Sequence, residues 1–173
     1  MAVRTLVLGG IRSGKTGMAE RTAQAHEGEV VYVATATAGD EEMAARIRRH
    51  QQARPGHWGL REAPLALAEV LADEAMRDEP PCLLIDCMSL WVSNLLHAGD
   101  AVFERERTAF LETVTAYPGG LIIVSNEVGL GTIGMDSLTR RFCDELGWLN
   151  QALAQRCDRV LMSVAGLPLV LKG

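Results

Sequence analysis

Gly9-Gly10-Ile11-Arg12-Ser13-Gly14-Lys15-Thr16 follows the apolar run from Val3 to Leu8 and has the pattern G-x-x-x-x-G-K-[ST]. In this pattern a strand leads through a glycine-rich loop into a helix, and the backbone N–H groups of the loop point into one concavity that attracts phosphate oxygens. The lysine reaches the β- and γ-phosphates of a nucleotide, and the hydroxyl after it can ligate Mg²⁺. The stretch therefore predicts a nucleoside triphosphate site, with Lys15 as a catalytic cation and Thr16 as a metal ligand.

Short apolar runs alternate with helical patterns along the whole chain. Strands are predicted at Val3–Leu8, Val30–Ala34, Cys82–Asp86, Leu121–Val124 and Val160–Val164, with a proline-containing edge strand at Leu167–Leu171. Helices are predicted at Gly14–His26, from Asp40 until Pro55 ends the pattern, and at Leu65–Met76, Leu90–Leu96, Phe103–Ala116 and Ser137–Gln155. Continuously apolar strands between helices indicate a mostly parallel sheet flanked by helices, and we expect a single α/β domain over residues 1–173.

Composition narrows the class of protein. The 173 residues are 48% hydrophobic and 23% charged, with a formal net charge of -5, whereas proteins that bind nucleic acid usually need excess positive charge. No apolar run approaches the roughly 20 residues of a membrane span, and the N-terminus has no secretory signal, so we expect a cytoplasmic protein. The four cysteines lack zinc-binding spacing and are expected to be reduced, mostly buried thiols.

Polar residues follow two predicted strands at the point where ligands gather in open parallel sheets. Asp86 comes directly after Leu83-Leu84-Ile85, the context of the second acidic residue of phosphate-loop proteins, which holds Mg²⁺ directly or through water. A merely solvated aspartate at a strand end is the alternative. The next strand delivers Ser125-Asn126-Glu127 to the same edge. Glu127 could orient or deprotonate an acceptor hydroxyl, or it could stabilise its own loop through a hydrogen bond.

The segment from Glu41 to Pro55 becomes strongly basic toward its end. Basic residues in the last turns of a helix can simply offset the negative end of the helix dipole while they face solvent. Arg46, His50 and Arg54 recur at four-residue intervals, however, and so can share one helix face. Cations beside an imidazole lower its pKa and keep a nitrogen lone pair free, which nucleophilic attack on phosphorus requires. The residues alone leave both interpretations open.

Two motifs of other nucleotide-binding proteins do not occur in the sequence. Without an [NT]-K-x-D element, a Ras-like regulatory GTPase is not expected. The chain also has no arginine-rich insertion like the lid of nucleoside monophosphate kinases, although Arg140-Arg141 could contact phosphates. A phosphotransferase that acts on a small molecule stays open.

The phosphate loop occurs together with several further motifs. These are Tyr32-Val33-Ala34-Thr35-Ala36, Glu42 to His50, Arg54-Pro55 with Trp58, Leu84 to Cys87, Val92 to Leu96 and Ser125 to Gly131. In this combination, over almost its full length, the chain resembles the bifunctional adenosylcobinamide kinase / adenosylcobinamide-phosphate guanylyltransferases of cobalamin biosynthesis. The segment around His50 and the loop after Asn126 make this resemblance far more specific than the phosphate loop, which very many proteins share.

The resemblance implies a RecA-like P-loop fold, a homotrimer and two consecutive reactions. ATP or GTP first phosphorylates the hydroxyl of the aminopropanol arm of adenosylcobinamide. GTP then donates GMP, through a covalent guanylyl-histidine, to that phosphate, which gives adenosyl-GDP-cobinamide and pyrophosphate. His50 matches the guanylylated histidine, and Thr16 and Asp86 are the implied Mg²⁺ ligands. The implied nucleotide-binding residues are Gly9, Gly10, Ile11, Arg12, Ser13, Gly14, Lys15, Thr16, Ala34, Thr35, Ala36, Gln51, Gln52, Ala53, Arg54, Glu62 and Asp86.

Two other functions compete with this one. A kinase for another small alcohol would transfer the γ-phosphate without a covalent nucleotide. A RecA-like assembly module would hydrolyse ATP in response to a protein or DNA partner. His26, His57 and His97 are expected to be surface or packing residues. Trp58, Trp91 and Trp148 could contact a corrinoid, although core packing is the expected use of each.

Overall fold

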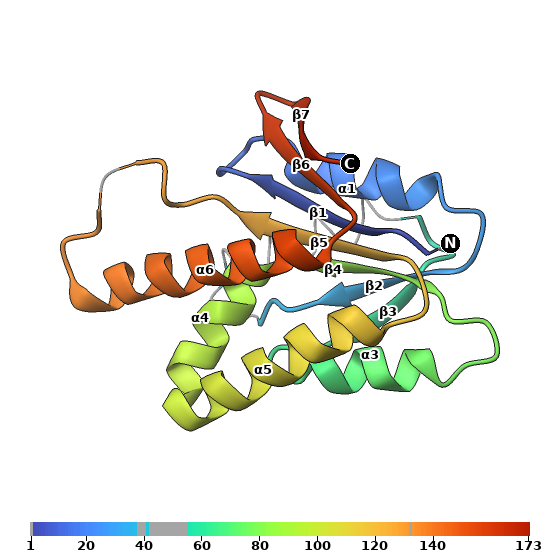
Figure 1. Ribbon diagram of the computed structural model, residues 1–173, viewed down its shortest axis with the longest axis horizontal. Coiled ribbons are helices and arrows are strands. Elements are labelled where there is room, and N and C mark those ends of the chain that lie inside the picture. The colour runs from blue at the N-terminus through green and yellow to red at the C-terminus, as the bar shows by residue number, and fades with distance from the viewer. Residues whose placement is uncertain (1, 38–40, 42–54, 132) are drawn as a thin grey trace.

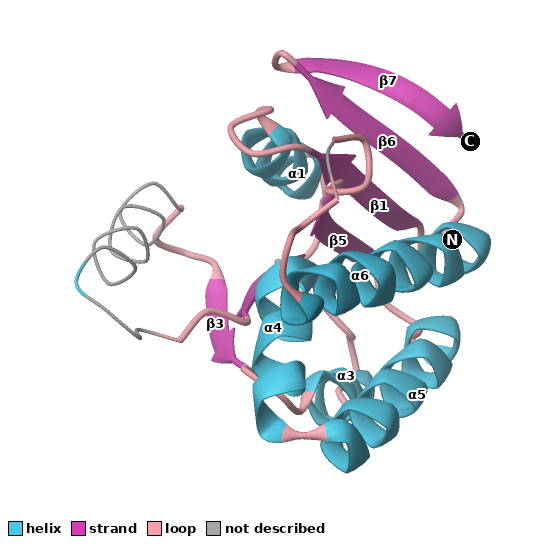
Figure 2. Ribbon diagram, turned by 90° about the vertical axis from the view of Figure 1, so that its left-hand side faces the viewer, coloured by secondary structure: helices cyan, strands magenta, loops and turns pink. Residues whose placement is uncertain are grey.

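The computed structural model of the chain describes residues 2–37, 41, 55–131 and 133–173. Within these residues one sheet of seven strands carries helix α1 on one face and helices α3 to α6 on the other (Figures 1 and 2). The predicted mostly parallel sheet flanked by helices is therefore confirmed. The basic segment of the sequence analysis, residues 42–54, lies outside the described residues.

Every described element except β3, which was not predicted, overlaps a predicted run. The strands are β1 (Arg4–Gly9), β2 (Val30–Ala34), β3 (Gly59–Glu62), β4 (Cys82–Asp86), β5 (Leu121–Asn126), β6 (Arg159–Val164) and β7 (Leu167–Lys172). The helices are α1 (Lys15–Gln24), α3 (Leu67–Ala75), α4 (Met88–Ala98), α5 (Asp100–Ala116) and α6 (Ser137–Arg156). None of these described helices is both long enough and apolar enough to cross a membrane.

The strand order decides which loops meet. Along the sheet it is β3-β2-β4-β5-β1-β6-β7, and every neighbouring pair is parallel except β6 and β7, which are antiparallel. Strand β7 lies at the edge, as its proline predicts. Strand β5 separates β1 from β4, so the carboxyl end of β5 lies between the phosphate loop and Asp86.

The continuous apolar runs of the strands follow from this layering. In β1, Leu6 and Leu8 pack into the core under α3 to α6, while Val7 packs into the core under α1. Because side chains alternate between the faces of a sheet and both faces are covered, the inner strands carry mostly apolar residues on both faces. Short α1 contributes Met18, Ala19 and Ala23 to its core and so lies close to the sheet.

Two details of the helical layer bear on the sequence predictions. Trp91 is fully buried and its indole N–H donates to the carbonyl of Leu65 at 2.8 Å, as core packing requires. Trp148 is 55% exposed on α6, so the expectation that it packs in the core is wrong. In sequence Trp148 lies between the buried Leu146 and Leu149, but the turn of the helix puts it on the opposite face of α6, away from the sheet.

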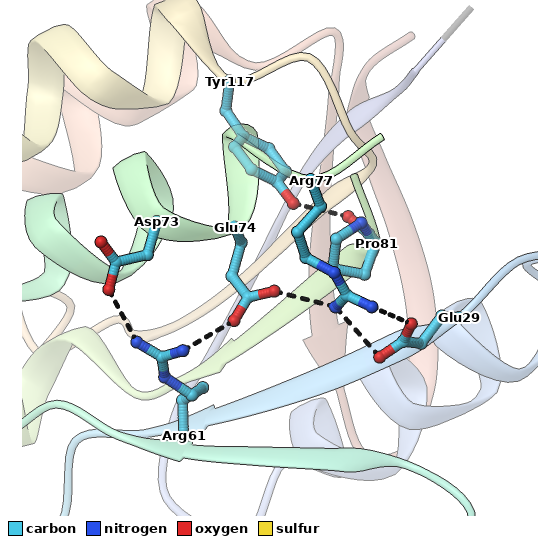
Figure 3. A network of polar contacts seen from close by, with 7 residues as sticks. All are labelled: Glu29, Arg61, Asp73, Glu74, Arg77, Pro81 and Tyr117. Atoms are coloured by element: carbon cyan, nitrogen blue, oxygen red, sulfur yellow. Dashed lines mark hydrogen bonds and ion pairs between the residues drawn. The ribbon is translucent and has the colours of Figure 1, made fainter. Parts of the chain in front are cut away.

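A network of charged residues ties α3 to the sheet (Figure 3). The carboxylate of Glu74 is buried and accepts hydrogen bonds from Arg61 and Arg77, each at 3.0 Å. Arg61 also pairs with Asp73 at 3.0 Å, and Arg77 pairs with Glu29, which precedes β2. The network thereby fixes α3 against β3 and the residue before β2 (Figure 3).

Candidate active site

The phosphate loop turns tightly between β1 and α1. Gly14 has φ of 91°, a left-handed conformation that glycine adopts without strain, and Arg12 has φ of 54°. A Cβ at Gly9 would overlap Ser13 Oγ and lie 2.9 Å from the carbonyl oxygen of Ser163. The first and last glycines of the motif are therefore required by the local geometry and not only by the sequence pattern.

The end of β6 and the turn after it hold the phosphate loop in place through hydrogen bonds to Ser13. The carbonyl oxygen of Ser13 accepts a hydrogen bond from Ser163 Oγ at 2.7 Å and another from the N–H of Gly166 at 2.8 Å. A Cβ at Gly14 would lie 3.0 Å from the Cα of Gly166, so the two backbones are in close contact. Sequence reasoning missed this support, since about 150 residues separate the partners. The glycine after β6 was a signal for the turn but not for what it contacts.

The amino end of α1 is prepared for an anion. Its N-cap residue, Gly14, provides no side-chain cap, and its first turn contains no acidic residue, so its N–H groups stay available to phosphate oxygens. Lys15 lies over the loop and its Nζ donates to the carbonyl oxygen of Gly10 at 3.2 Å. Thr16 occupies the next position of the same turn. This arrangement can hold the phosphates of a nucleotide.

Asp86 ends β4 at the same edge of the sheet. Its Oδ2 accepts a hydrogen bond from the hydroxyl of Tyr32 at 3.0 Å. The neighbouring Cys87 is half-buried, and burial raises the pKa of its thiol, with the charge of Asp86 acting in the same direction. A hydrogen bond with Ser89 and the charge of Lys15 lower that pKa by less. Cys87 is thus kept as a neutral thiol, while Asp86 offers a carboxylate to the site.

Thr35 locks the end of β2 to the end of β4. Its hydroxyl donates to the carbonyl oxygen of Cys87 at 2.8 Å and accepts from the N–H of Cys87 at 2.9 Å. Asn94 of α4 donates to the carbonyl oxygen of Thr35 at 2.9 Å. The side chain of Thr35 is therefore occupied within the protein, and Ala34 and Ala36 on either side are half-buried. Glu62 pairs in register with Ala34 and is exposed at this edge.

The end of β5 lies beside the phosphate loop. Asn126 is in register with Gly9, and the N–H of Glu127 donates to the carbonyl oxygen of Gly9 at 3.1 Å. The Oε1 atom of Glu127 accepts from the N–H of Gly129 at 2.7 Å, which is the loop-stabilising alternative of the sequence analysis. Asn150 of α6 supports this end, since its Nδ2 donates to the carbonyl oxygen of Asn126 at 3.0 Å.

The remaining candidates fall into three groups. His50, Gln51, Gln52, Ala53 and Arg54 lie outside the described residues. Arg140 donates to the carbonyl oxygens of Gly134 and Met135, and Arg141 pairs with Asp100 at 2.8 Å, so both arginines are engaged within the protein. The histidines His26, His57 and His97 are exposed, in agreement with the surface role predicted for them.

Solved structures of known proteins support the fold. The chain aligns with the RadB recombinase at a TM-score of 0.51 and 16% identity, over 92% of this chain and 73% of that one. It aligns with an ATPase of a type III secretion system at a TM-score of 0.54 and 12% identity, over 97% of this chain and 56% of that one. At such identities the likeness concerns the fold alone, and it confirms the predicted RecA-like P-loop architecture.

Sequence relatives define the family. The protein-family model for cobinamide kinase / cobinamide phosphate guanyltransferase matches residues 5–171 of the chain. The bifunctional adenosylcobalamin biosynthesis protein CobP of Pseudomonas aeruginosa is 51% identical over 172 residues, which cover 99% of this chain and 98% of that protein. The bifunctional adenosylcobalamin biosynthesis protein CobU of Salmonella typhimurium is 34% identical over 181 residues, which cover 96% of this chain and 98% of that protein. The chain therefore belongs to the cobinamide kinase / cobinamide phosphate guanyltransferase family.

Proposed function

We propose that this chain phosphorylates the hydroxyl of adenosylcobinamide with ATP or GTP and then transfers GMP from GTP to the new phosphate. The observation that carries the proposal is the phosphate loop, which the β6–β7 turn holds in shape under the ammonium of Lys15. Membership of the family supports the choice of substrate. By the same resemblance we propose a homotrimer that works in the cytoplasm.

The nucleotide would be held by residues 9–16, by Ala34, Thr35 and Ala36, by residues 51–54 and by Glu62. Lys15 would stabilise negative charge on the phosphates. The hydroxyl of Thr16 and the carboxylate of Asp86 are hard oxygen ligands at one edge of the sheet, which suits Mg²⁺. When bound there, the ion neutralises charge that develops on the phosphoryl groups. Asp86 would hold the ion directly or through a water molecule.

In the transfer step, a neutral His50 would attack the α-phosphorus of GTP. A bond forms between the imidazole nitrogen and phosphorus while the bond to the pyrophosphate oxygen breaks. A phosphate oxygen of the phosphorylated substrate then attacks the same phosphorus and releases the imidazole. Lys15 would stabilise the departing pyrophosphate, as it stabilises the γ-phosphoryl group in the kinase step.

Intact-protein mass spectrometry after incubation with GTP and Mg²⁺ tests the proposal. The wild type is expected to gain one GMP, bound as an acid-labile phosphoramidate, and His50→Ala to gain none while it still phosphorylates adenosylcobinamide. His57→Ala, which changes an exposed histidine, is the matched control and should form the adduct. Phosphorylation of a corrinoid without any adduct would reject the transferase half. ATP hydrolysis that responds only to a protein or DNA partner would reject both halves.

A further inference from the structure

A pocket of about 370 Å³ opens between α4, the first turns of α6 and the end of β5. Its volume lies within the range of roughly 300–1,000 Å³ that is usual for small-molecule sites. The apolar part of its wall comes from Leu90 and Leu96 of α4 and from Leu138 and Phe142 of α6. Ser89, Ser93, Thr139 and His97 add polar groups, and no carboxylate, lysine or arginine is among the described residues that line it. The pocket therefore suits a neutral ligand with polar substituents.

Asn126 lines this pocket and carries a hydrogen-bond acceptor without a partner in the described part of the chain. Its Oδ1 atom is buried and has no partner among the described residues. The backbone of Asn126 is held in place, because Asn150 donates to its carbonyl oxygen and Asn150 itself accepts a hydrogen bond of 2.6 Å from Ser125. A buried acceptor without a donor costs free energy, and a ligand that brings a hydroxyl or an N–H group would recover it.

The position of Asn126 relates this acceptor to the phosphate loop. Asn126 and Gly9 are in register on neighbouring strands, which are about 4.8 Å apart. The phosphates of a nucleotide bind along residues 9–16 in the proposed function. A ligand hydroxyl that donates to Asn126 would consequently lie at the same carboxyl edge of the sheet as the phosphate loop.

The segment that leads from β5 to the pocket wall on α6 exposes large apolar side chains. Leu130, Ile133 and Met135 follow β5, and Leu138 begins α6. Their exposed fractions are 78%, 80%, 99% and 52%, which is unusual for large apolar side chains gathered within nine residues of sequence. Leu138 also lines the pocket, so an apolar ligand that extends out of the pocket past Leu138 could cover this segment.

We propose that this pocket binds the alcohol-bearing arm of the corrinoid, with the hydroxyl donating a hydrogen bond to Oδ1 of Asn126 and the macrocycle lying over the exposed apolar side chains that follow β5. The inference rests on the proposed function and adds the acceptor side of its first step. A whole corrinoid exceeds the pocket, so the arm enters and the ring stays outside. Asn126 is thereby a positioning residue that touches the substrate.

Equilibrium binding with two ligands tests this assignment. One ligand is adenosylcobinamide, and the other is an analogue whose arm is propylamine and so lacks the hydroxyl. The wild type should bind the first about tenfold more tightly, and Asn126→Ala should bind both equally, because the hydrogen bond is lost in either case. Ser93→Phe, which fills the pocket from α4, should weaken both ligands more than tenfold. Gln151→Phe, on the exposed side of α6, is the matched control and should bind both ligands as the wild type does.

The outcomes separate this inference from the proposed function. If Asn126→Ala lowers the affinity for both ligands by the same factor, the roughly tenfold preference for adenosylcobinamide is kept and the pocket is not the site of the arm. The same conclusion follows if Ser93→Phe binds both ligands as the wild type does. Nucleotide affinity, measured in each variant, shows whether the protein is folded, and Asn126→Ala keeps the test usable if Ser93→Phe does not fold. A wild type that phosphorylates no corrinoid and forms no GMP adduct would instead reject the proposed function itself.

Discussion

The two edges of the sheet treat polar groups differently. Toward the amino ends of the strands, Arg77 joins Glu29 to the buried carboxylate of Glu74, which also accepts from Arg61 of β3, and Tyr117 donates to the carbonyl oxygen of Pro81 at 2.7 Å (Figure 3). At the carboxyl ends, Ser13 Oγ and Asn126 Oδ1 are buried without a partner among the described residues. Of the buried side-chain atoms in this state, only Arg107 Nε lies elsewhere in that part of the chain.

This difference separates stability from function. Groups that satisfy one another lower the free energy of the folded chain but have nothing left for a ligand. Groups that stay unsatisfied cost stability, and natural proteins tend to keep such costs at functional sites. Substitutions at the amino edge should therefore change unfolding, while substitutions at the carboxyl edge should change chemistry.

The largest effect is expected from Lys15→Met. The substitution keeps the length of the side chain but removes the charge that would stabilise the phosphoryl group. We expect the rates of corrinoid phosphorylation and of GMP adduct formation to fall by about 10²–10³-fold in single-turnover kinetics. The free energy of unfolding should change by less than about 1 kcal/mol, because one hydrogen bond to Gly10 is lost. Normal rates with a much lower stability would erase the distinction between the edges.

A pair of glycine substitutions should give the next largest effect. In Gly9→Ala the new methyl group overlaps Ser13 Oγ and lies 2.9 Å from the backbone oxygen of Ser163, which cannot move without β6. We expect a loss of about 1–3 kcal/mol and about tenfold weaker nucleotide binding by calorimetry. In Gly10→Ala the methyl group meets nothing within 4 Å, so its thermal unfolding should shift much less. Equal shifts in the two variants would show that the contact with Ser163 does not shape the loop.

Features whose residues are neighbours along the chain could be predicted from the sequence. Strands β2 and β4 have the predicted bounds, because runs such as Val30–Ala34 and Cys82–Asp86 are apolar at both faces. The phosphate loop could be predicted because its residues are neighbours in the chain. Strand β3 was not predicted, since Gly59–Glu62 is short, polar and alternately exposed beside β2.

Long-range features could not be predicted in the same way. Neither the support of Ser13 by Ser163 nor the free acceptor of Asn126 follows from any local pattern, because both depend on the order of strands in the sheet. Trp148 was assigned to the core from its residue type alone, whereas its exposure depends on the rotation of α6 against α4. Strand order and helix rotation are set by packing, which a motif does not encode.

At the amino edge, Glu74→Gln should lower stability by about 1–2 kcal/mol, because the buried group can no longer offer two charged acceptors to Arg61 and Arg77. For a chain of this size that is a fall in Tm of about 2–8 °C. Glu112→Gln changes an exposed glutamate of α5 and is the control with an unchanged Tm. Because Glu74 is remote from the phosphate loop, the rates of the Gln variant at 20 °C should equal those of the wild type.

The smallest effect concerns the first residue of β4. Burial raises the pKa of Cys82 to about 11, and the thiol has a lower pKa in the unfolded chain, where it is solvated. A raised pKa stabilises the folded state below the unfolded value, and the contribution is lost as the pH rises toward the folded value. Raising the pH from 8 to 10 should therefore lower the free energy of unfolding by about 1 kcal/mol through Cys82. Urea unfolding at the two pH values measures this loss.

In Cys82→Ala the loss between pH 8 and pH 10 should become smaller but should not vanish, because burial also raises the pKa of Cys157 to about 11 and raises the pKa of Tyr117. The same measurement with bound nucleotide sharpens the comparison of the two edges. Cys82 owes its raised pKa to burial alone, so a triphosphate beside Lys15 should leave its contribution unchanged. A pH dependence in which the Cys82 contribution changes with nucleotide would instead show that charge at the carboxyl edge is felt at the amino edge, and the two regions could no longer be treated as independent.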